Sequence, residues 1–214
     1  FDSLRSLTIV LSEIEARLKR NRRMNIAVFA SGRGSNFAAI IRAIKKGKIK
    51  ASLSLLVCDQ PGAGAIGRAK RAGIKVALVE REDFATKEDF ENRIIQHLEE
   101  NQIDLIVLAG YMRLVDPKLL ARYKNRILNI HPSLLPSCKG TEGIKDVFNY
   151  GVKVTGVTVH FVDEEMDHGP IILQKTVPIE GDDTQKSLET KIHKLEHKLY
   201  PEAIRLVVEG KSKV

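Results

Sequence analysis

The chain has 214 residues, of which 43% are hydrophobic and 29% are charged. This length and composition predict one domain with a continuous core, although two domains would also fit. No apolar stretch approaches the roughly 20 residues that a helix needs to cross a bilayer. The short apolar run at 7–11 is soon followed by charged residues, so neither a membrane protein nor a secretory signal is indicated.

The formal net charge of +8 raises the question of nucleic-acid binding. Six basic and three acidic residues fall within residues 1–23, so part of the excess lies in this short segment. The other basic residues are interspersed with acids, aromatic residues make up 5% of the chain, and no nucleic-acid-binding motif is present. A small anionic substrate therefore explains the charge better than a nucleic acid does.

The two cysteines, Cys58 and Cys138, lack the paired spacing of metal ligands. In a chain without an export signal we expect free thiols and a reducing compartment, which predicts a cytoplasmic protein.

A boundary is expected at Met24, where a basic segment gives way to an apolar one. Residues 1–23 are interpreted as an N-terminal extension or leader, and residues 24–214 as the functional domain. The extension has the spacing of an amphipathic helix, with apolar residues at Leu4, Leu7, Leu11, Ile14 and Leu18. We assign it no chemistry.

After Met24, apolar segments alternate with charged, periodic ones. This alternation is typical of a mostly parallel sheet covered by helices. Five strands are predicted in this part, at 25–30, 53–57, 76–79, 104–109 and 127–131. Two further strands, at 155–162 and 171–177, follow each other without a long helix and predict an antiparallel extension. A last helix is predicted to begin near Thr184, and Pro201 is expected to kink or interrupt it.

A glycine-rich loop, Ser31–Asn36, follows the first predicted strand and precedes a helical segment at 37–44. The amides around Gly34, with the side chains of Ser35 and Asn36, could hold a phosphate at the helix N-terminus. Phe37 stands where a dinucleotide fingerprint has its third glycine, so a single phosphate fits better than a pyrophosphate. The alternative is a glycine-rich turn with Ser35 as the helix N-cap.

Asn129 and His131 lie two residues apart at the end of a predicted strand, so their side chains share one face. Pro132 tends to end that strand, which leaves His131 at its carboxyl end, where open α/β sheets bind ligands. Asp167 lies in a predicted loop that could bring it to His131. These residues are candidates for an acid/base site. Taken singly, each could instead be structural.

Two further groups are candidate contacts. Residues 112–114 follow the strand that ends near Gly110, where Arg113 could pair with a carboxylate. On the last helix, His193 and Glu196 lie on one strip together with Tyr200. The alternatives are core residues with a solvated Arg113 in the first group, and a solvated helix face in the second.

Taken together, these motifs make the chain resemble the phosphoribosylglycinamide formyltransferase family, also called glycinamide ribonucleotide transformylases, from Met24 to about Gly210. The specific matches are Ser31–Asn36, Ala109–Arg113, Asn129–Pro136 and Gly156–Val162 with Asp167–Pro170.

The resemblance implies a single-domain, Rossmann-like α/β fold. It also implies transfer of a formyl group from 10-formyltetrahydrofolate to the amine of glycinamide ribonucleotide in purine synthesis. No metal is implied, the partners are the ribonucleotide and the folate, and the protein would be a monomer or homodimer. By motif, the resemblance assigns catalysis to Asn129, His131 and Asp167. It assigns the nucleotide and its phosphate to Gly34, Ser35, Asn36, His193 and Glu196. It assigns the folate to Lys87, Met112, Arg113, Leu114, Val162, Asp163 and Glu164.

One segment departs from the family pattern. After Pro136 the family usually has an aromatic residue, a Pro-Gly or Lys-Gly pair and then a His or Asn in a mobile loop. This chain has Ser137–Gly143 there, with Glu142 near the usual His or Asn.

Several rival functions remain at this stage. Methionyl-tRNA formyltransferase and formyltetrahydrofolate hydrolase are similar around the catalytic trio, but each carries an additional domain, and the length of this chain favours neither. A nicotinamide-dependent oxidoreductase would need the full glycine fingerprint and an acidic residue for the ribose, for which Asp59 is the candidate. A nucleotide-binding module without catalysis would leave the trio without a purpose.

Overall fold

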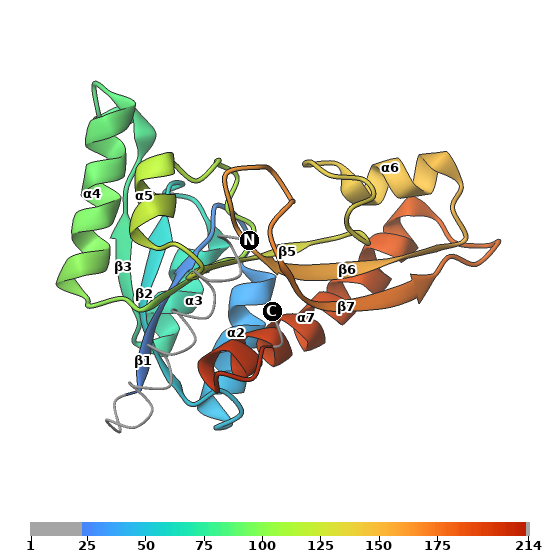
Figure 1. Ribbon diagram of the computed structural model, residues 1–214, viewed down its shortest axis with the longest axis horizontal. Coiled ribbons are helices and arrows are strands. Elements are labelled where there is room, and N and C mark those ends of the chain that lie inside the picture. Colours follow the sequence, from blue (N-terminus) through green and yellow to red (C-terminus); the bar gives the residue numbers. More distant parts are fainter. Residues whose placement is uncertain (1–22, 213–214) are drawn as a thin grey trace.

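The computed structural model describes residues 23–212. A seven-stranded sheet forms the centre of the molecule, with strand order β3-β2-β1-β4-β5-β6-β7 (Figure 1). The strands are β1 (Met24–Phe29), β2 (Ala51–Cys58), β3 (Lys75–Leu78), β4 (Leu105–Leu108), β5 (Ile127–His131), β6 (Val154–Phe161) and β7 (Ile171–Pro178). The helices are α2 (Ser35–Lys45), α3 (Gly64–Ala72), the 3-10 turn η1 (Arg81–Asp83), α4 (Lys87–Glu100), α5 (Pro117–Arg122), α6 (Gly143–Tyr150) and α7 (Gln185–Val208).

The sheet is parallel from β3 through β5 and antiparallel from β5 through β7. The predicted α/β class, the parallel sheet and its antiparallel extension are therefore confirmed, and β5 has the predicted bounds. The other strands differ from their predicted ranges by one or two residues at their ends, where local sequence signals are weakest.

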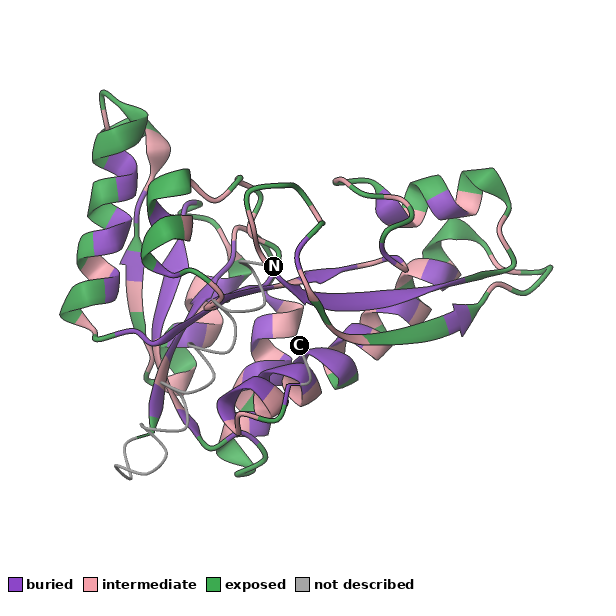
Figure 2. Ribbon diagram, in the orientation of Figure 1, coloured by how far each residue is buried: buried purple, intermediate pink, exposed green. Residues whose placement is uncertain are grey.

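Both faces of the sheet are buried at its central strands, which explains why these strands are nearly continuous apolar runs, whereas the edge strand β7 is mostly exposed (Figure 2). Along β1, Ile26 and Val28 pack with α2, α3 and α7, whereas Ala27 and Phe29 pack with α4 and α5 on the other face. Because side chains alternate along a strand, β1 contributes residues to two separate core layers, one on each face of the sheet.

Helix α7 is anchored to the centre of the sheet by Tyr200, which is fully buried. Its hydroxyl lies 2.7 Å from the carbonyl oxygen of Leu108 in β4 and 3.1 Å from that of Leu128 in β5. Tyr200 was grouped with His193 and Glu196 on a polar strip, but it is a core residue. Of the two predicted effects of Pro201, a kink or an interruption, the interruption was wrong, because α7 continues through Pro201 to Val208.

Among the described residues, no helix has the length and apolar character needed to cross a membrane.

Candidate active site

Asn129 and His131 both lie on β5, with their side chains on the same side of the sheet. The antiparallel neighbour β6 places His160 directly opposite Asn129 and Thr158 opposite His131. His131 is buried, and its position at the last residue of β5 puts it at the carboxyl edge of the parallel part of the sheet. This is the edge that the sequence predicted for ligand binding.

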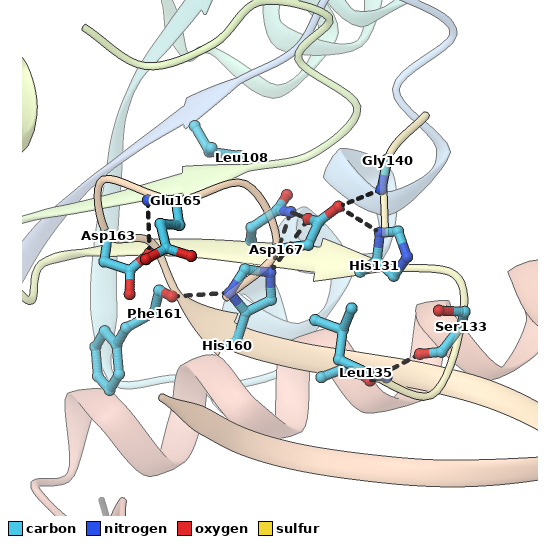
Figure 3. A network of polar contacts seen from close by, with 12 residues as sticks. Leu108, His131, Ser133, Leu135, Gly140, His160, Phe161, Asp163, Glu165 and Asp167 are labelled. Carbon is cyan, nitrogen blue, oxygen red and sulfur yellow. Dashed lines mark hydrogen bonds and ion pairs between the residues drawn. The ribbon is translucent and has the colours of Figure 1, made fainter. Parts of the chain in front are cut away.

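Asp167 reaches this edge from the loop between β6 and β7 (Figure 3). One carboxylate oxygen, Oδ2, accepts a hydrogen bond of 2.8 Å from the backbone amide of Gly140 and lies 3.3 Å from Nδ1 of His131. The other, Oδ1, lies 3.4 Å from the amide nitrogen of Asn129 and 3.7 Å from Nε2 of His160. The structure therefore brings the three predicted catalytic residues together around one buried carboxylate.

The loop that carries Asp167 depends on Gly169. A Cβ atom at this position would lie 2.0 Å from the carbonyl oxygen of Phe161, so the two ends of the loop approach each other as only glycine permits. Asp167 itself has a φ of +51°, a left-handed conformation that aspartate tolerates better than most residues. The close approach of the loop ends thus fixes the direction of the carboxylate.

Both ring nitrogens of His131 lie close to oxygen atoms that can accept hydrogen bonds. Nε2 lies 2.7 Å from the carbonyl oxygen of Cys138, which can only accept, so this nitrogen donates. Nδ1 faces the carboxylate of Asp167, which also only accepts when ionised. The two nitrogens of the ring are thus directed at two different acceptors, one from the Ser137–Gly143 segment and one from the β6–β7 loop.

Asp167 is held in its charged form. Burial alone would raise its pKa, but the contact with His160, the hydrogen bond from the Gly140 amide and the charge of His131 outweigh burial and leave the pKa below its ordinary value. The site thus combines an ionised carboxylate with an imidazole whose Nε2 donates to a backbone carbonyl.

The segment with the atypical sequence, Ser137–Gly143, is tied to this centre. Its Cys138 carbonyl accepts from His131 and its Gly140 amide donates to Asp167. Glu142, which stands near the usual His or Asn, is instead exposed and pairs with Lys145 at 3.0 Å. In this chain the segment contributes backbone groups, rather than a titratable side chain, to the trio.

The glycine-rich loop forms a second part of the site. Gly34 has a φ of +69°, and a Cβ there would lie 2.9 Å from Cβ of Ala65, so the loop needs glycine at this point. Helix α2 begins at Ser35, and its N-cap is Gly34, without a side-chain cap. The alternative that Ser35 is the N-cap was therefore wrong, and the Ser35 side chain is not used as a helix cap.

Asn36 connects this loop to α7. Its Nδ2 donates to Oε2 of Glu196 at 3.0 Å, and its Oδ1 is buried without a hydrogen-bond partner among the described residues. Nδ1 of His193 lies 2.9 Å from the same Glu196 oxygen, and Nε2 lies 3.3 Å from Glu189. The hydrogen bond to Glu196 is the main cause of the raised pKa of His193. The structure thus brings three of the predicted nucleotide residues into contact.

A cavity of about 280 Å³ lies beside these groups, between the segment after β5 and the start of α7. Its lining residues are Pro132, Thr141, Glu142, Ile144, Lys145, Gln185 and Glu189.

The predicted folate residues lie on three segments. Met112 and Leu114 are 73% and 67% exposed, so the alternative that they are core residues was wrong. Arg113 is not simply a solvated charge, because its Nε donates to Asp59 at 2.7 Å and its guanidinium lies over the ring of Phe90. This ion pair also engages Asp59, the candidate ribose residue of the oxidoreductase alternative.

Lys87 begins α4 and pairs with Asp116 at 3.0 Å, close in sequence to the exposed 112–114 segment. Val162, Asp163 and Glu164 lie in the β6–β7 loop that carries Asp167. Asp163 holds this loop through His168 at 2.8 Å, and Glu164 is exposed.

Residues 24–204 match the sequence profile of the formyl transferase family. The chain belongs to this family. Its relatives include the phosphoribosylglycinamide formyltransferase of Bacillus subtilis, which is 50% identical over 179 residues, covering 84% of this chain and 92% of that protein. The human trifunctional purine biosynthetic protein adenosine-3 is 36% identical over 189 residues, which are 88% of this chain and 19% of that much longer protein.

Solved structures of similar proteins support the same family membership. Glycinamide ribonucleotide transformylase 1 from Geobacillus kaustophilus is 48% identical to this formyl transferase and has a TM-score of 0.85, covering 87% of this chain and 100% of that one. Phosphoribosylglycinamide formyltransferase from Bacillus halodurans is also 48% identical, with a TM-score of 0.84 and coverage of 86% and 95%.

Sequence reasoning missed one residue in the centre of this formyl transferase. Nδ1 of His160 donates to the carbonyl of Phe161 at 2.8 Å, because a carbonyl only accepts. Its Nε2 is then directed at Asn129, 3.3 Å away. His160 belongs to the motif at 156–162, but only the pairing of β5 with β6 shows that it stands opposite Asn129.

Proposed function

We propose that this formyl transferase moves the formyl group of 10-formyltetrahydrofolate to the amine of glycinamide ribonucleotide. The products are formylglycinamide ribonucleotide and tetrahydrofolate, as expected for purine synthesis. The observation that carries the proposal is the contact of Asn129, His131 and Asp167 at the carboxyl end of β5. The likeness to proteins named phosphoribosylglycinamide formyltransferase supports it.

In the proposed reaction the substrate amine attacks the formyl carbon, and negative charge develops on the formyl oxygen. Asn129 and His131 supply N–H donors for this oxyanion, which is the most effective way for a protein to lower such a barrier. Nε2 of His131 now donates to the Cys138 carbonyl, and the oxyanion would take that hydrogen bond in its place.

The proton of the attacking amine must then reach the departing nitrogen of the folate. Asp167 is suited to position the water that carries this proton, because its lowered pKa keeps it ionised and its oxygens accept hydrogen bonds. The same carboxylate lies 3.3 Å from Nδ1 of His131 and so orients the ring. No step in this scheme requires a metal.

The nucleotide phosphate is assigned to the amides around Gly34 and to Ser35 and Asn36, at the N-terminus of α2. The uncapped helix start supports this assignment. We assign Glu196 to the nucleotide hydroxyl groups, because an ionised carboxylate accepts hydrogen bonds from them, and His193 to holding Glu196 in place.

The folate is assigned to exposed Met112 and Leu114, to Arg113 and Lys87, and to the loop residues Val162, Asp163 and Glu164. The exposed apolar side chains support this, since a flat ring can pack between them. Arg113 or Lys87 would pair with the acidic tail of the folate. We expect residues 24–214 to suffice for activity, in a monomer or a homodimer, without a nucleic-acid or membrane partner.

We place the reaction in the cytoplasm. Cys58 and Cys138 are both free thiols, as predicted, which is consistent with a reducing compartment.

The test is to follow the loss of 10-formyltetrahydrofolate by absorbance, with and without glycinamide ribonucleotide. Loss that requires the nucleotide is the expected result. Equal loss without the nucleotide would identify a hydrolase instead, and no loss in either reaction would overturn the proposal.

A further inference from the structure

A second cavity, of about 540 Å³, lies between α2 and α7. These helices pack against each other on one face of the sheet (Figure 1). The cavity faces the last turns of α2 and the middle of α7. Its basic or imidazole-bearing lining residues are Arg42, Lys46, Lys48, His197, Lys198 and Arg205.

The positive charge of this cavity is poorly neutralised. Of the lining residues that the structure describes, one is a carboxylate, Glu202, which lies 3.5 Å from Lys175 outside the cavity. Arg205 pairs with Glu209 at 2.9 Å. Within residues 23–212, no ion pair or side-chain hydrogen bond involves the other four cations, which are Arg42, Lys46, Lys48 and Lys198.

Helix electrostatics account for only part of this arrangement. Arg42 and Arg205 lie in the last turns of α2 and α7, where cations favour the helix dipole. Lys198 lies in the middle of α7, so it does not gain in this way. Like charges gathered around one cavity repel each other, and a bound anion would offset that repulsion.

An unpartnered group lies in the same lining. Nε2 of His197 is buried and makes no hydrogen bond among the described residues. Pro201, one helical turn later, has no N–H to donate to the backbone carbonyl of His197, so the helix ladder is interrupted beside the cavity. The small side chains of Ala39 and Ala43 leave the space open.

We propose that this cavity binds a small anion that carries two or more phosphate groups, held by Arg42, Lys46 and Lys198. Its volume lies within the range of small-molecule sites, about 300–1,000 Å³. Among the described residues, no aromatic side chain lines the cavity to stack on a base, so recognition would rest on the phosphate chain. The same absence disfavours single-stranded nucleic acid, which binds through stacked bases as well as charge.

This site is separate from the phosphate loop of the proposed active site. Asn36 lies in the first turn of α2 and Lys46 is the C-cap of the same helix, ten residues later, which corresponds to about 15 Å along the helix axis. None of the residues assigned to the nucleotide or the folate lines the cavity. A ligand here would therefore be additional to the substrates.

The test is isothermal titration of the purified protein with inorganic tripolyphosphate and, separately, with ATP, at one fixed salt concentration. The variant Lys46→Ala/Lys198→Ala removes one cation from each wall. The matched control, Lys45→Ala/Lys194→Ala, removes the same charge from the same two helices, at exposed positions that do not line the cavity. Thermal unfolding of all three proteins establishes that they are folded.

We expect tripolyphosphate to bind wild type and the control equally, and the cavity variant at least about tenfold more weakly, since charge-assisted hydrogen bonds to phosphate are lost. Tighter binding of ATP than of tripolyphosphate, lost in the same variant, would support the site and identify a nucleoside polyphosphate as its ligand. Equal binding by all three proteins would overturn the proposal, because the anion would then sit in the phosphate loop. Absence of tripolyphosphate binding at millimolar concentration would also overturn the proposal. A short single-stranded RNA that binds wild type more tightly than either probe, and binds the cavity variant more weakly than wild type, would overturn it as well.

Discussion

The most informative single change is Asp167→Asn, which keeps the size of the side chain and removes its charge. In the folded protein this carboxylate is buried, with 8% of the side chain exposed, and lies 3.3 Å from Nδ1 of His131. For this carboxylate and a full positive charge at that distance, Coulomb's law with an effective dielectric constant of about 20 gives roughly 5 kcal/mol, which is an upper bound for the interaction. A hydrogen bond to a charged group contributes less in net terms, about 1.5–3 kcal/mol.

The loss of proton transfer adds to this effect. General acid–base catalysis by one side chain contributes about 10²–10⁴-fold to a rate. We therefore expect kcat for Asp167→Asn to fall by about 10²–10⁴-fold, while KM for glycinamide ribonucleotide changes little, since the nucleotide residues lie elsewhere. The assay is the absorbance change of the formyl folate under saturating substrates.

The control is Glu165→Gln, which removes a carboxylate from an exposed side chain of the same loop. Glu165 contacts the loop through its backbone amide, which donates to Asp163, and the substitution leaves this amide in place. It should leave kcat and KM as in wild type. Asp167→Asn with an unchanged kcat, in a protein that unfolds at the wild-type temperature, would refute the assigned role.

The same substitution has a consequence for stability. Because the pKa of Asp167 is lowered in the folded state, its charge stabilises the fold above the pKa of an unfolded aspartate, about 3.9. That contribution disappears as the pH falls through the lower, folded value. The variant should therefore lose stability relative to wild type at neutral pH, and the difference should shrink in acid.

Three further predictions concern the supporting structure. His193→Gln removes an imidazolium whose pKa is raised by Glu196, so its stabilisation of the fold should be complete below about pH 6.5 and fade as the pH rises through the raised value. Because the side chain is 37% exposed, we expect the variant to lose about 0.2–1 kcal/mol of the free energy of unfolding, measured in urea. A loss that does not change with pH would contradict the role given to His193. Tyr200→Phe removes the hydroxyl that bonds two buried carbonyl groups of β4 and β5, and should lower the free energy of unfolding by about 1–3 kcal/mol, whereas an unchanged thermal midpoint would show that α7 is not anchored there. Gly169→Ala places a methyl group 2.0 Å from a backbone oxygen and should cost more than about 2 kcal/mol and most of the activity. Gly62→Ala, with no atom within 4 Å, is its control, and equal stability of the two variants would argue against the close approach of the loop ends.

Much of the site follows from local patterns. The alternation of apolar segments predicts the layered fold, because a strand buried on both faces needs an uninterrupted apolar run and a crossover helix needs a periodic one. Asn129 and His131 share a face because side chains alternate along a strand, and Pro132 places them at the strand end. The position of Gly34 before α2 follows in the same way from the need for a left-handed residue.

Other features depend on contacts between distant residues. Asp59 and Arg113 are 54 residues apart, and no local pattern shows that the arginine is committed to a buried carboxylate. His160 looks like any polar residue in a strand until β6 pairs with β5 and sets it opposite Asn129. For Glu142, the position in the chain suggests a place in a catalytic loop. The structure instead shows its side chain paired with Lys145.

The sequence by itself thus determined the class of fold, the strand that carries the amide and the imidazole, and the family to which the chain is similar. These depend on periodicity, turn residues and short motifs, all of which act over a few neighbouring residues. Only the tertiary structure decided which groups touch. The 3.3 Å contact of His131 with Asp167, the bond between Asn36 and Glu196 and the cationic cavity between α2 and α7 each join segments far apart in the chain. Their formation depends on how the helices and strands pack, and packing is a property of the whole core rather than of any one segment.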